Sequence, residues 1–430
     1  MRHDDRIAII GGGPSGLSLA KLLDESGAKN VTVFEKLPTP GGRSWTIHEG
    51  AATAEMGTCY TTLSHWHVKR WMRQTGISLK RNGKVLFDGR SFMDYVRQGG
   101  GPPFAVQALR YFWDGADLRR RLAQKNPSQA TIDEASLSIL DWLRQRDLPK
   151  VELFLHRIIT IMGYGFLDET PAVQAHRWCD IVLFVSGALN QLHMPVEGWR
   201  EFWRRLSEGL DVKTNCPVEK IERREYGVTV VSPEGREHFD HVVCAMPLDE
   251  FTKLVAAPTE AETYVNASVE WQGYTTSLVA SDNWFTDWHV EGYSDTVVPG
   301  APLGRLVGAR KETYEPELGG QLYVTGQLSR GLPDSELREM AEAELARRGA
   351  DVKNFIMQMN WKYFAQYKKE AVKDGLLAVM RDMQGEARTW YTGATFSFEA
   401  VSHISNFNAR LAKKMLVERK AALEPARARP

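Results

Sequence analysis

The sequence has no excess of charge of either sign and no apolar run long enough to cross a membrane. Its 430 residues carry 54 basic and 54 acidic side chains, whereas a nucleic-acid-binding protein usually presents a strongly basic surface. A membrane-spanning helix needs about 20 consecutive apolar residues, and no segment approaches that length. We therefore expect a cytoplasmic protein without a signal peptide or transmembrane segment, whose partner is a small molecule rather than a nucleic acid.

Cysteine is also scarce. The four cysteines are Cys59, Cys179, Cys216 and Cys244, and they lack the close spacing that is typical of metal sites. The sequence therefore predicts no metal centre and no disulfide framework, in keeping with a reducing compartment. Cys179 and Cys244 stand in apolar stretches, where we expect them to pack in the core.

Glycine, in contrast, is concentrated where an apolar strand leads into a helix, in the segment RIAIIGGGPSGLSLA. Gly11 permits a tight turn, Gly13 lets the backbone approach a pyrophosphate, and Gly16 allows close packing of helix on strand. The helix begins at Pro14 and Ser15, so its free N–H groups point at the anion. This arrangement predicts a dinucleotide-binding turn.

Glu35 ends the next predicted strand, about 20 residues after Gly16, which is where a βαβ unit places the acid that binds the ribose. Lys36 follows it at the same edge and belongs to the same predicted site. The sequence offers no second glycine fingerprint, which argues against a separate nicotinamide-binding domain.

Two further turns indicate which dinucleotide is bound. The segments PGGRS and EMG follow the acid, and they resemble the flavin-containing amine oxidase superfamily. The resemblance implies that the cofactor is FAD. Gly42 and Arg43 would contact a second phosphate, while Met56, Gly57 and Thr58 would pass beneath the flavin ring.

A final motif near the C-terminus completes the resemblance. Gly393 ends an aromatic strand, and Ser397 and Phe398 lead into a helix whose N-terminus would face the pyrimidine end of the flavin. The backbone of Val218 would meet the adenine. Ala394 replaces an acid that usually follows the glycine, and the motif contains no cysteine, so we expect FAD to be bound non-covalently.

These features predict an α/β fold in which a Rossmann-type FAD-binding domain is combined with an antiparallel-sheet substrate domain and a helical insert. Apolar residues at three- and four-residue spacing predict the helices, and short β-rich runs predict the second sheet. The predicted order is FAD-binding domain, first part, at 1–98; helical insert and substrate pocket at 99–192; FAD-binding domain, second part, at 193–249; antiparallel-sheet substrate domain at 250–376; FAD-binding domain, last part, and C-terminal helix at 377–430.

Within the superfamily, the sequence is most similar to the bacterial FAD-dependent polyunsaturated fatty acid isomerase. The matching pieces keep their order over most of the chain, and the Gly- and Ala-rich run that follows the last motif of amine oxidases is replaced by FSFEAVSH. The resemblance implies that FAD acts as a reversible hydride carrier at N5 and that the enzyme isomerises a double bond in an apolar, unsaturated substrate.

Two other functions stay open at this point. The first is an FAD-dependent oxidase or dehydrogenase in a biosynthetic pathway, which would desaturate its substrate or oxidise an amine. The second is a flavin-binding protein without turnover. No catalytic side chain is assigned, because the chemistry is expected at flavin N5.

The wall of the substrate pocket should be aromatic. The candidates are Tyr164, Phe166, Phe184, Tyr363, Phe364 and Phe396. In the isomerase family the gate at the tunnel mouth is aromatic, whereas the corresponding positions here are Met162 and Gly187, which speaks against a long-chain fatty acid. Arg81 would bind a substrate carboxylate by the same resemblance, with an exposed surface arginine as the alternative.

Overall fold

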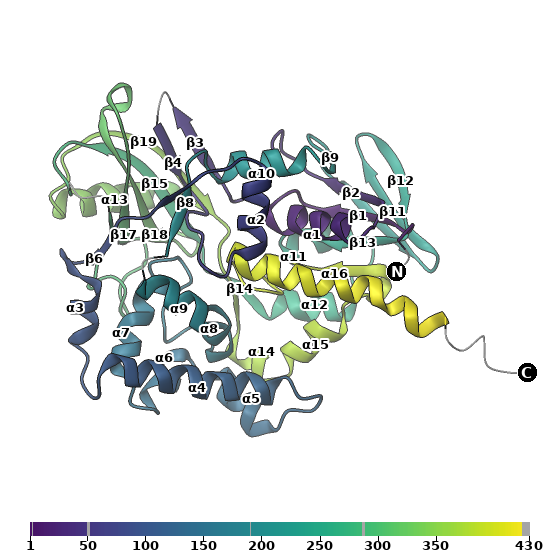
Figure 1. The fold of residues 1–430 in the computed structure, drawn as a ribbon, viewed down its shortest axis with the longest axis horizontal. Coiled ribbons are helices and arrows are strands. Elements are labelled where there is room, and N and C mark those ends of the chain that lie inside the picture. The colour runs from purple at the N-terminus through teal and green to yellow at the C-terminus, as the bar shows by residue number, and fades with distance from the viewer. Residues whose placement is uncertain (2, 50–51, 190, 286–288, 424–430) are drawn as a thin grey trace, which may run out of the picture.

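The structure is a computed structural model that describes residues 1–430 except 2, 50–51, 190, 286–288 and 424–430. Its elements gather in three regions: a parallel sheet with its helices, a large and mainly antiparallel sheet, and a group of helices beneath them (Figure 1). Within the described part of the chain, no helix combines the length and apolar character that a membrane crossing requires.

The first region is a five-stranded parallel sheet that collects strands from distant parts of the chain. In spatial order its strands are β21 (Thr389–Tyr391), β13 (His241–Cys244), β1 (Arg6–Ile10), β2 (Asn30–Phe34) and β9 (Asp211–Lys213). Successive residues of a strand point to opposite faces, so Ile7 and Ile9 enter one core while Ala8 and Ile10 enter another. Both faces are therefore covered, as is typical of parallel sheets.

The second region is a seven-stranded sheet. Its order is β19 (Val352–Trp361), β15 (Tyr274–Ser281), β18 (Gly320–Leu328), β17 (Leu306–Glu315), β16 (His289–Gly292), β6 (Lys84–Phe87) and β7 (Arg90–Ser91). The pairing of β16 with β6 is parallel and the other pairings are antiparallel. The strands β6 and β7 thus come from the N-terminal part of the sequence, whereas the other strands of this sheet are formed by residues beyond 270.

The third region is a group of helices, most of which lie in the stretch 99–192. Its helices are α3 (Phe92–Arg97), α4 (Phe104–Leu122), α5 (Gln129–Ser136), α6 (Ile139–Arg144), α7 (Pro149–Ile158), α8 (Ala172–Trp178) and α9 (Ile181–Ala188). Ser128, Ser138 and Asp180 start three of them by accepting a backbone N–H three residues on, as N-cap residues do. The helices enclose an aromatic core that includes Tyr111, Trp142, Phe154 and Trp178.

The remaining elements connect these regions. They are β3 (Thr46–Glu49), β4 (Ala52–Glu55), β5 (Leu79–Arg81), β8 (His193–Pro195), β10 (Lys220–Arg224), β11 (Gly227–Ser232), β12 (Gly235–Phe239), β14 (Val269–Trp271), β20 (Ala365–Tyr367), α1 (Pro14–Glu25), α2 (Trp66–Gln74), α10 (Trp199–Ser207), α11 (Leu248–Leu254), α12 (Glu260–Ala267), α13 (Asp334–Arg347), α14 (Lys369–Lys373), α15 (Leu376–Asp382) and α16 (Val401–Leu423), with short 3₁₀ turns at Pro316–Leu318 and Glu386–Arg388. The long α16 lies along α1 (Figure 1). The combination confirms the predicted α/β class.

A buried carboxylate joins three of these elements. Glu262, on α12, accepts two hydrogen bonds from the Arg223 guanidinium of β10, both at 2.9 Å, and one from the Tyr391 hydroxyl of β21 at 2.8 Å. It also caps its own helix by accepting the Thr259 N–H at 2.7 Å. The carboxylate is fully buried and the arginine nearly so, so each charge depends on the other for compensation.

Glu262→Gln should therefore destabilise the protein by about 3 kcal/mol, because the amide leaves the buried Arg223 charge without compensation. The free energy of unfolding in urea measures this effect. The matched control is Glu342→Gln, which removes an exposed ion pair with Arg338 on α13 and should cost no more than about 0.5 kcal/mol. Equal losses in the two variants would contradict the assignment.

Candidate active site

The first of two large cavities opens at the carboxyl ends of β1 and β2, and its volume is about 590 Å³. Ligands of open parallel sheets bind at such an edge. Many of the predicted cofactor residues line it, namely Gly11, Gly13, Pro14, Ser15, Glu35, Lys36, Gly42, Arg43, Val218 and Gly393. The structure therefore brings together residues that lie almost the whole chain apart.

The glycines at this edge are required for two different reasons. A Cβ at Gly16 would lie 1.9 Å from the Gly11 carbonyl oxygen, so Gly16 is needed for packing of the helix on the turn. A Cβ at Gly13 would meet no protein atom nearer than 3.7 Å. Since Gly13 lines the cavity at the uncapped start of α1, the space beside it suits a ligand group, and the helix N-terminus favours an anionic one.

Glu35 is held at the same edge with its carboxylate in place. Its Oε2 accepts the Gly12 N–H and its Oε1 accepts the Leu37 N–H, each at 2.8 Å. A carboxylate oxygen has a further lone pair, so both oxygens can also accept ribose hydroxyls. The glycine turn, the helix start and Glu35 together fit the adenosine diphosphate portion of FAD.

The sequence did not identify several other residues of this cavity. They include Trp45, Cys216, Pro217, Met246, Lys253 and Trp361. Met246 follows β13, which pairs with β1 in the parallel sheet, so its position could have been inferred from the rule that ligands bind beyond the carboxyl ends of the strands. The two tryptophans carry no comparable signal, because Trp361 ends β19 of the other sheet and Trp45 precedes β3, and neither strand belongs to the parallel sheet.

The second cavity adjoins the first, since Pro14, Ser15, Arg43 and Trp361 line both. Of the predicted site residues, Met56, Gly57, Thr58, Tyr164 and Tyr363 lie here, as do the two mouth positions Met162 and Gly187. Much of the remaining wall is aliphatic or aromatic, including Phe154, Ile158, Ile161 and Leu183. The site thus consists of a nucleotide cavity and an adjoining, largely apolar cavity.

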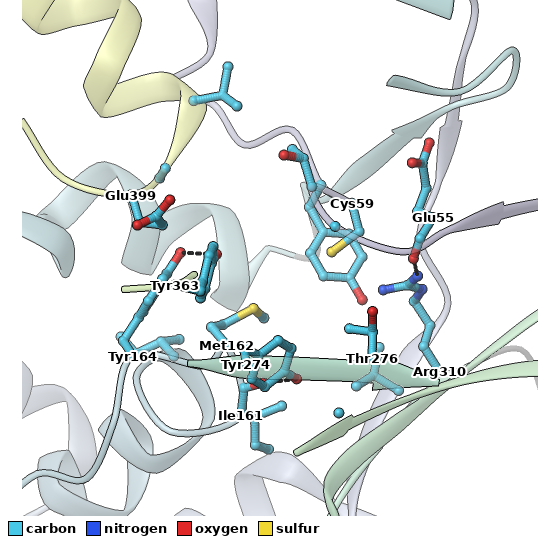
Figure 2. Close-up of a pocket in the computed structure, with 18 of the residues that line it drawn as sticks. Glu55, Cys59, Ile161, Met162, Tyr164, Tyr274, Thr276, Arg310, Tyr363 and Glu399 are labelled. Carbon is cyan, nitrogen blue, oxygen red and sulfur yellow. Dashed lines mark hydrogen bonds between the residues drawn. The ribbon is translucent and has the colours of Figure 1, made fainter. Parts of the chain in front are cut away.

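Two tyrosines form one side of the apolar cavity (Figure 2). The rings of Tyr164 and Tyr363 are nearly parallel, at 20°, with 5.7 Å between their centroids, and their hydroxyl oxygens lie 3.5 Å apart. A flat group inserted between two rings would need about 7 Å, twice an ordinary van der Waals contact. The pair is therefore a wall that a substrate touches from one side.

The other aromatic candidates lie behind this wall or away from it. Phe364 and Phe398 pack on Tyr164, each with 5.0 Å between centroids, and are buried. Phe396 stacks on Tyr391 in the core beneath the parallel sheet. These three residues, together with Phe166, Phe184 and Ser397, are not among the residues that line the two cavities.

Each of these side chains has a contact that explains its position. Phe166 is buried in the core of the helical insert, and Phe184 contacts Phe112 in the same region. The Ser397 hydroxyl donates to the Gly393 carbonyl at 2.9 Å. Arg81 lies at the surface, where its guanidinium donates to the Leu189 carbonyl at 3.1 Å.

Charged side chains line the apolar cavity at separate places. Arg43 pairs with Glu399 at 2.7 Å beside the tyrosines, and burial raises the pKa of the Glu399 carboxyl. Arg310 lies on the opposite side (Figure 2) and pairs with Glu312 at 2.5 Å. Apart from Arg43, the sequence did not identify these groups. The described residues contain no cluster of His, Cys, Asp or Glu that could hold a metal ion.

Glu55 lies in the same wall, at the end of β4. Its Oε1 accepts the Trp199 N–H and its Oε2 contacts the Thr46 hydroxyl, both at 2.9 Å. Burial raises the pKa of the Glu55 carboxyl to about 8, and the two hydrogen bonds offset this only in part. The carboxyl is therefore largely protonated at neutral pH, although the Thr46 hydroxyl donates to its Oε2.

Comparisons with known proteins agree with this geometry. A model of the family described as flavin containing amine oxidoreductase matches residues 14–372. A Mycobacterium tuberculosis protein whose name describes it as a flavin-containing monoamine oxidase is 25% identical over 309 residues, which cover 67% of each chain. The polyenoic fatty acid isomerase of Ptilota filicina is 31% identical over 260 residues, or 52% of each chain.

Among solved structures, the CLA-producing fatty acid isomerase from P. acnes has the same fold. The TM-score is 0.82, and the match covers 97% of this chain and 100% of that chain at 20% sequence identity.

Gly13→Val should yield a folded protein with little or no bound flavin. The space beside Gly13 is open to a ligand but not otherwise filled by protein, so the valine methyl groups would occupy the position of the phosphates. Flavin absorbance per polypeptide measures the loss, and circular dichroism checks the fold. Gly209→Val is the matched control, since Gly209 is exposed and a Cβ there meets nothing within 4 Å. A Gly13→Val protein with a full complement of flavin would refute the assignment.

Glu55 should make the protein less stable as the pH rises. Between the ordinary pKa of 4.5 and about 8, the folded protein holds a proton that the unfolded chain has lost, so the free energy of unfolding falls across this window. Glu55→Gln imitates the protonated acid, so the free energy of unfolding of this variant should fall less steeply with rising pH. Urea unfolding at several pH values provides the slopes. Glu49→Gln, at an exposed position on β3, should keep the wild-type slope, and an unchanged slope in Glu55→Gln would show that Glu55 ionises normally.

Proposed function

This chain belongs to the flavin-containing amine oxidoreductase family, and we propose that it is an FAD-dependent enzyme that moves a double bond within an apolar, unsaturated substrate. The observation that carries this proposal is the apolar cavity with its stacked Tyr164 and Tyr363, which adjoins a cavity suited to FAD. The two fatty acid isomerases among the similar proteins support the same reaction.

The cofactor would be held by the nucleotide cavity. Gly13 and the start of α1 would bind the pyrophosphate, Glu35 the ribose, and Arg43 the region where the two cavities meet. When bound, FAD supplies a hydride acceptor and donor at N5. We propose non-covalent binding, because burial raises the pKa of the Cys59 thiol to about 11 and so disfavours the reactive thiolate.

The protein's own contribution is to position the substrate and to exclude water. Aliphatic and aromatic side chains suit a hydrocarbon chain, and a dry site protects a reactive intermediate from the solvent. Glu399 is 3% exposed and neutralised by Arg43, while the Glu55 carboxyl is largely protonated. Few groups in this wall are therefore free to act as a base, which suits an isomerisation that needs hydride transfer alone.

The stacked tyrosines also bear on the alternative, an amine-oxidising enzyme. Amine oxidases of this superfamily place an aromatic pair around the substrate amine, but Tyr164 and Tyr363 lie too close together to admit a group between them. An oxidase or dehydrogenase that desaturates its substrate stays the second candidate. It is favoured by the similarity to the monoamine oxidase of Mycobacterium tuberculosis, which extends over more of the chain than that to the Ptilota filicina isomerase.

Isotope labelling separates the two reactions. With an allylically deuterated substrate, an isomerase should form a product of unchanged mass in which the deuterium has moved to another carbon, because the hydride stays in a site without water. The reaction should also continue without oxygen. Mass spectrometry and a peroxide assay provide the measurements. Stoichiometric peroxide and an unlabelled product two mass units lighter than its substrate would establish the oxidase instead.

A further inference from the structure

Arg157 is a cation in the wall of the apolar cavity that no carboxylate neutralises. It stands in the last turn of α7, and Phe154 and Ile158 of the same helix line the cavity beside it. Among the residues that the structure describes, Arg157 forms no hydrogen bond and no ion pair. Its guanidinium lies over the ring of Phe92, with 4.8 Å between Cζ and the ring centroid.

The other two arginines of this cavity are different. Arg43 pairs with Glu399 and donates to the Lys362 carbonyl at 2.5 Å. Arg310 pairs with Glu312 and donates to the Glu55 backbone carbonyl at 2.5 Å. Both are therefore occupied in structural contacts, whereas the donors of Arg157 are available to a molecule inside the cavity.

An arginine in such surroundings is unfavourable in the absence of an anion. Burial lowers the pKa of the Arg157 guanidinium to about 10, and the Tyr60 phenol offsets this only in part. The group still carries its charge at neutral pH. The side chain is half-buried, so water compensates its charge only in part, and a bound anion would complete the compensation.

We propose that Arg157 binds the anionic end of the substrate and that this end is a carboxylate. The planar guanidinium can donate two parallel hydrogen bonds to a carboxylate. A single uncompensated arginine matches a singly charged group better than a phosphate, which carries nearly two charges at neutral pH. The inference rests on the proposed function and makes it more specific, since the substrate becomes an unsaturated carboxylic acid whose apolar chain extends toward Tyr164 and Tyr363.

The family resemblance had pointed to Arg81 for this role. In the structure Arg81 lies at the surface on β5, contacts the Leu189 carbonyl, and is not among the residues lining the cavity. The two arginines are on different elements, so a matched pair of variants can distinguish them.

The experiment measures binding rather than turnover. Wild-type holoenzyme is titrated with saturated, unreactive carboxylates, namely hexanoate, decanoate and dodecanoate, and with the alcohols of the same chain lengths. Binding is measured by calorimetry and by the change in the flavin spectrum. Decanoate should bind at least about tenfold more tightly than decan-1-ol, because a hydrogen bond to a charged group contributes that much or more. Arg157→Met should abolish this preference, Arg157→Lys should keep part of it, and Arg81→Met should keep all of it.

Each outcome has one meaning. Loss of the preference in Arg157→Met, at unchanged flavin content and with a melting temperature no lower than that of the wild type, supports the assignment. The assignment is overturned if Arg157→Met keeps the preference, if Arg81→Met loses it, or if the wild type binds carboxylates no better than alcohols. Carboxylate binding through Arg157 in an enzyme that releases peroxide would contradict the isomerase proposal while leaving the anion site intact.

Discussion

The pairing of β1 with β2 places the glycine turn and Glu35 side by side at one edge of the parallel sheet. Ile10 lies opposite Phe34, and the Gly11 N–H donates to the Phe34 carbonyl at 2.9 Å. Glu35, which follows Phe34, then meets Gly12, two residues after Ile10: a Cβ at Gly12 would lie only 2.8 Å from that of Glu35. The nucleotide cavity, and through Arg43 the apolar cavity beside it, depends on this register.

Several charges inside the molecule are compensated by an oppositely charged side chain. Glu262 with Arg223, Arg43 with Glu399, and Arg310 with Glu312 are buried or half-buried pairs, each of which joins segments or stabilises a wall. Removing one member of such a pair exposes the other to the full cost of its burial. Arg157 departs from the pattern inside a cavity, and a departure there is more informative than one at the surface, where water would compensate the charge.

The sequence was sufficient to predict the features that depend on local patterns. The glycine turn, the acid at the end of the second strand and the α/β class could be recognised because strand periodicity and turn chemistry are local. A strand break was harder to place: the β-rich stretch 211–224 is divided between β9 and β10, and Pro217, which lacks an N–H, lies between them. The three- and four-residue spacing of apolar residues was also sufficient to predict that the insert is helical.

Side-chain direction and long-range pairing could not be predicted in the same way. Tyr164 and Phe166 are two residues apart, yet one lines the cavity and the other lies in the core, because the direction depends on the turn at residues 163–165, where Gly163 and Gly165 have positive φ. Likewise, β6 and β7 join a sheet whose other strands come much later in the chain. The pairing of Arg43 with Glu399 spans more than 350 positions, and no local pattern marks Arg157 as unpaired.

The assembly of the parallel sheet has a consequence for the newly made protein. The central strand β1 is made long before its neighbour β13, which ends at Cys244, and before β21, which completes that edge and ends at Tyr391. At synthesis rates of roughly 5–20 residues per second, the nascent chain carries an incomplete apolar sheet for tens of seconds. During that time the exposed surface is open to chaperones and to aggregation. Because the nucleotide cavity needs the completed sheet edge, cofactor binding becomes one of the last steps in maturation.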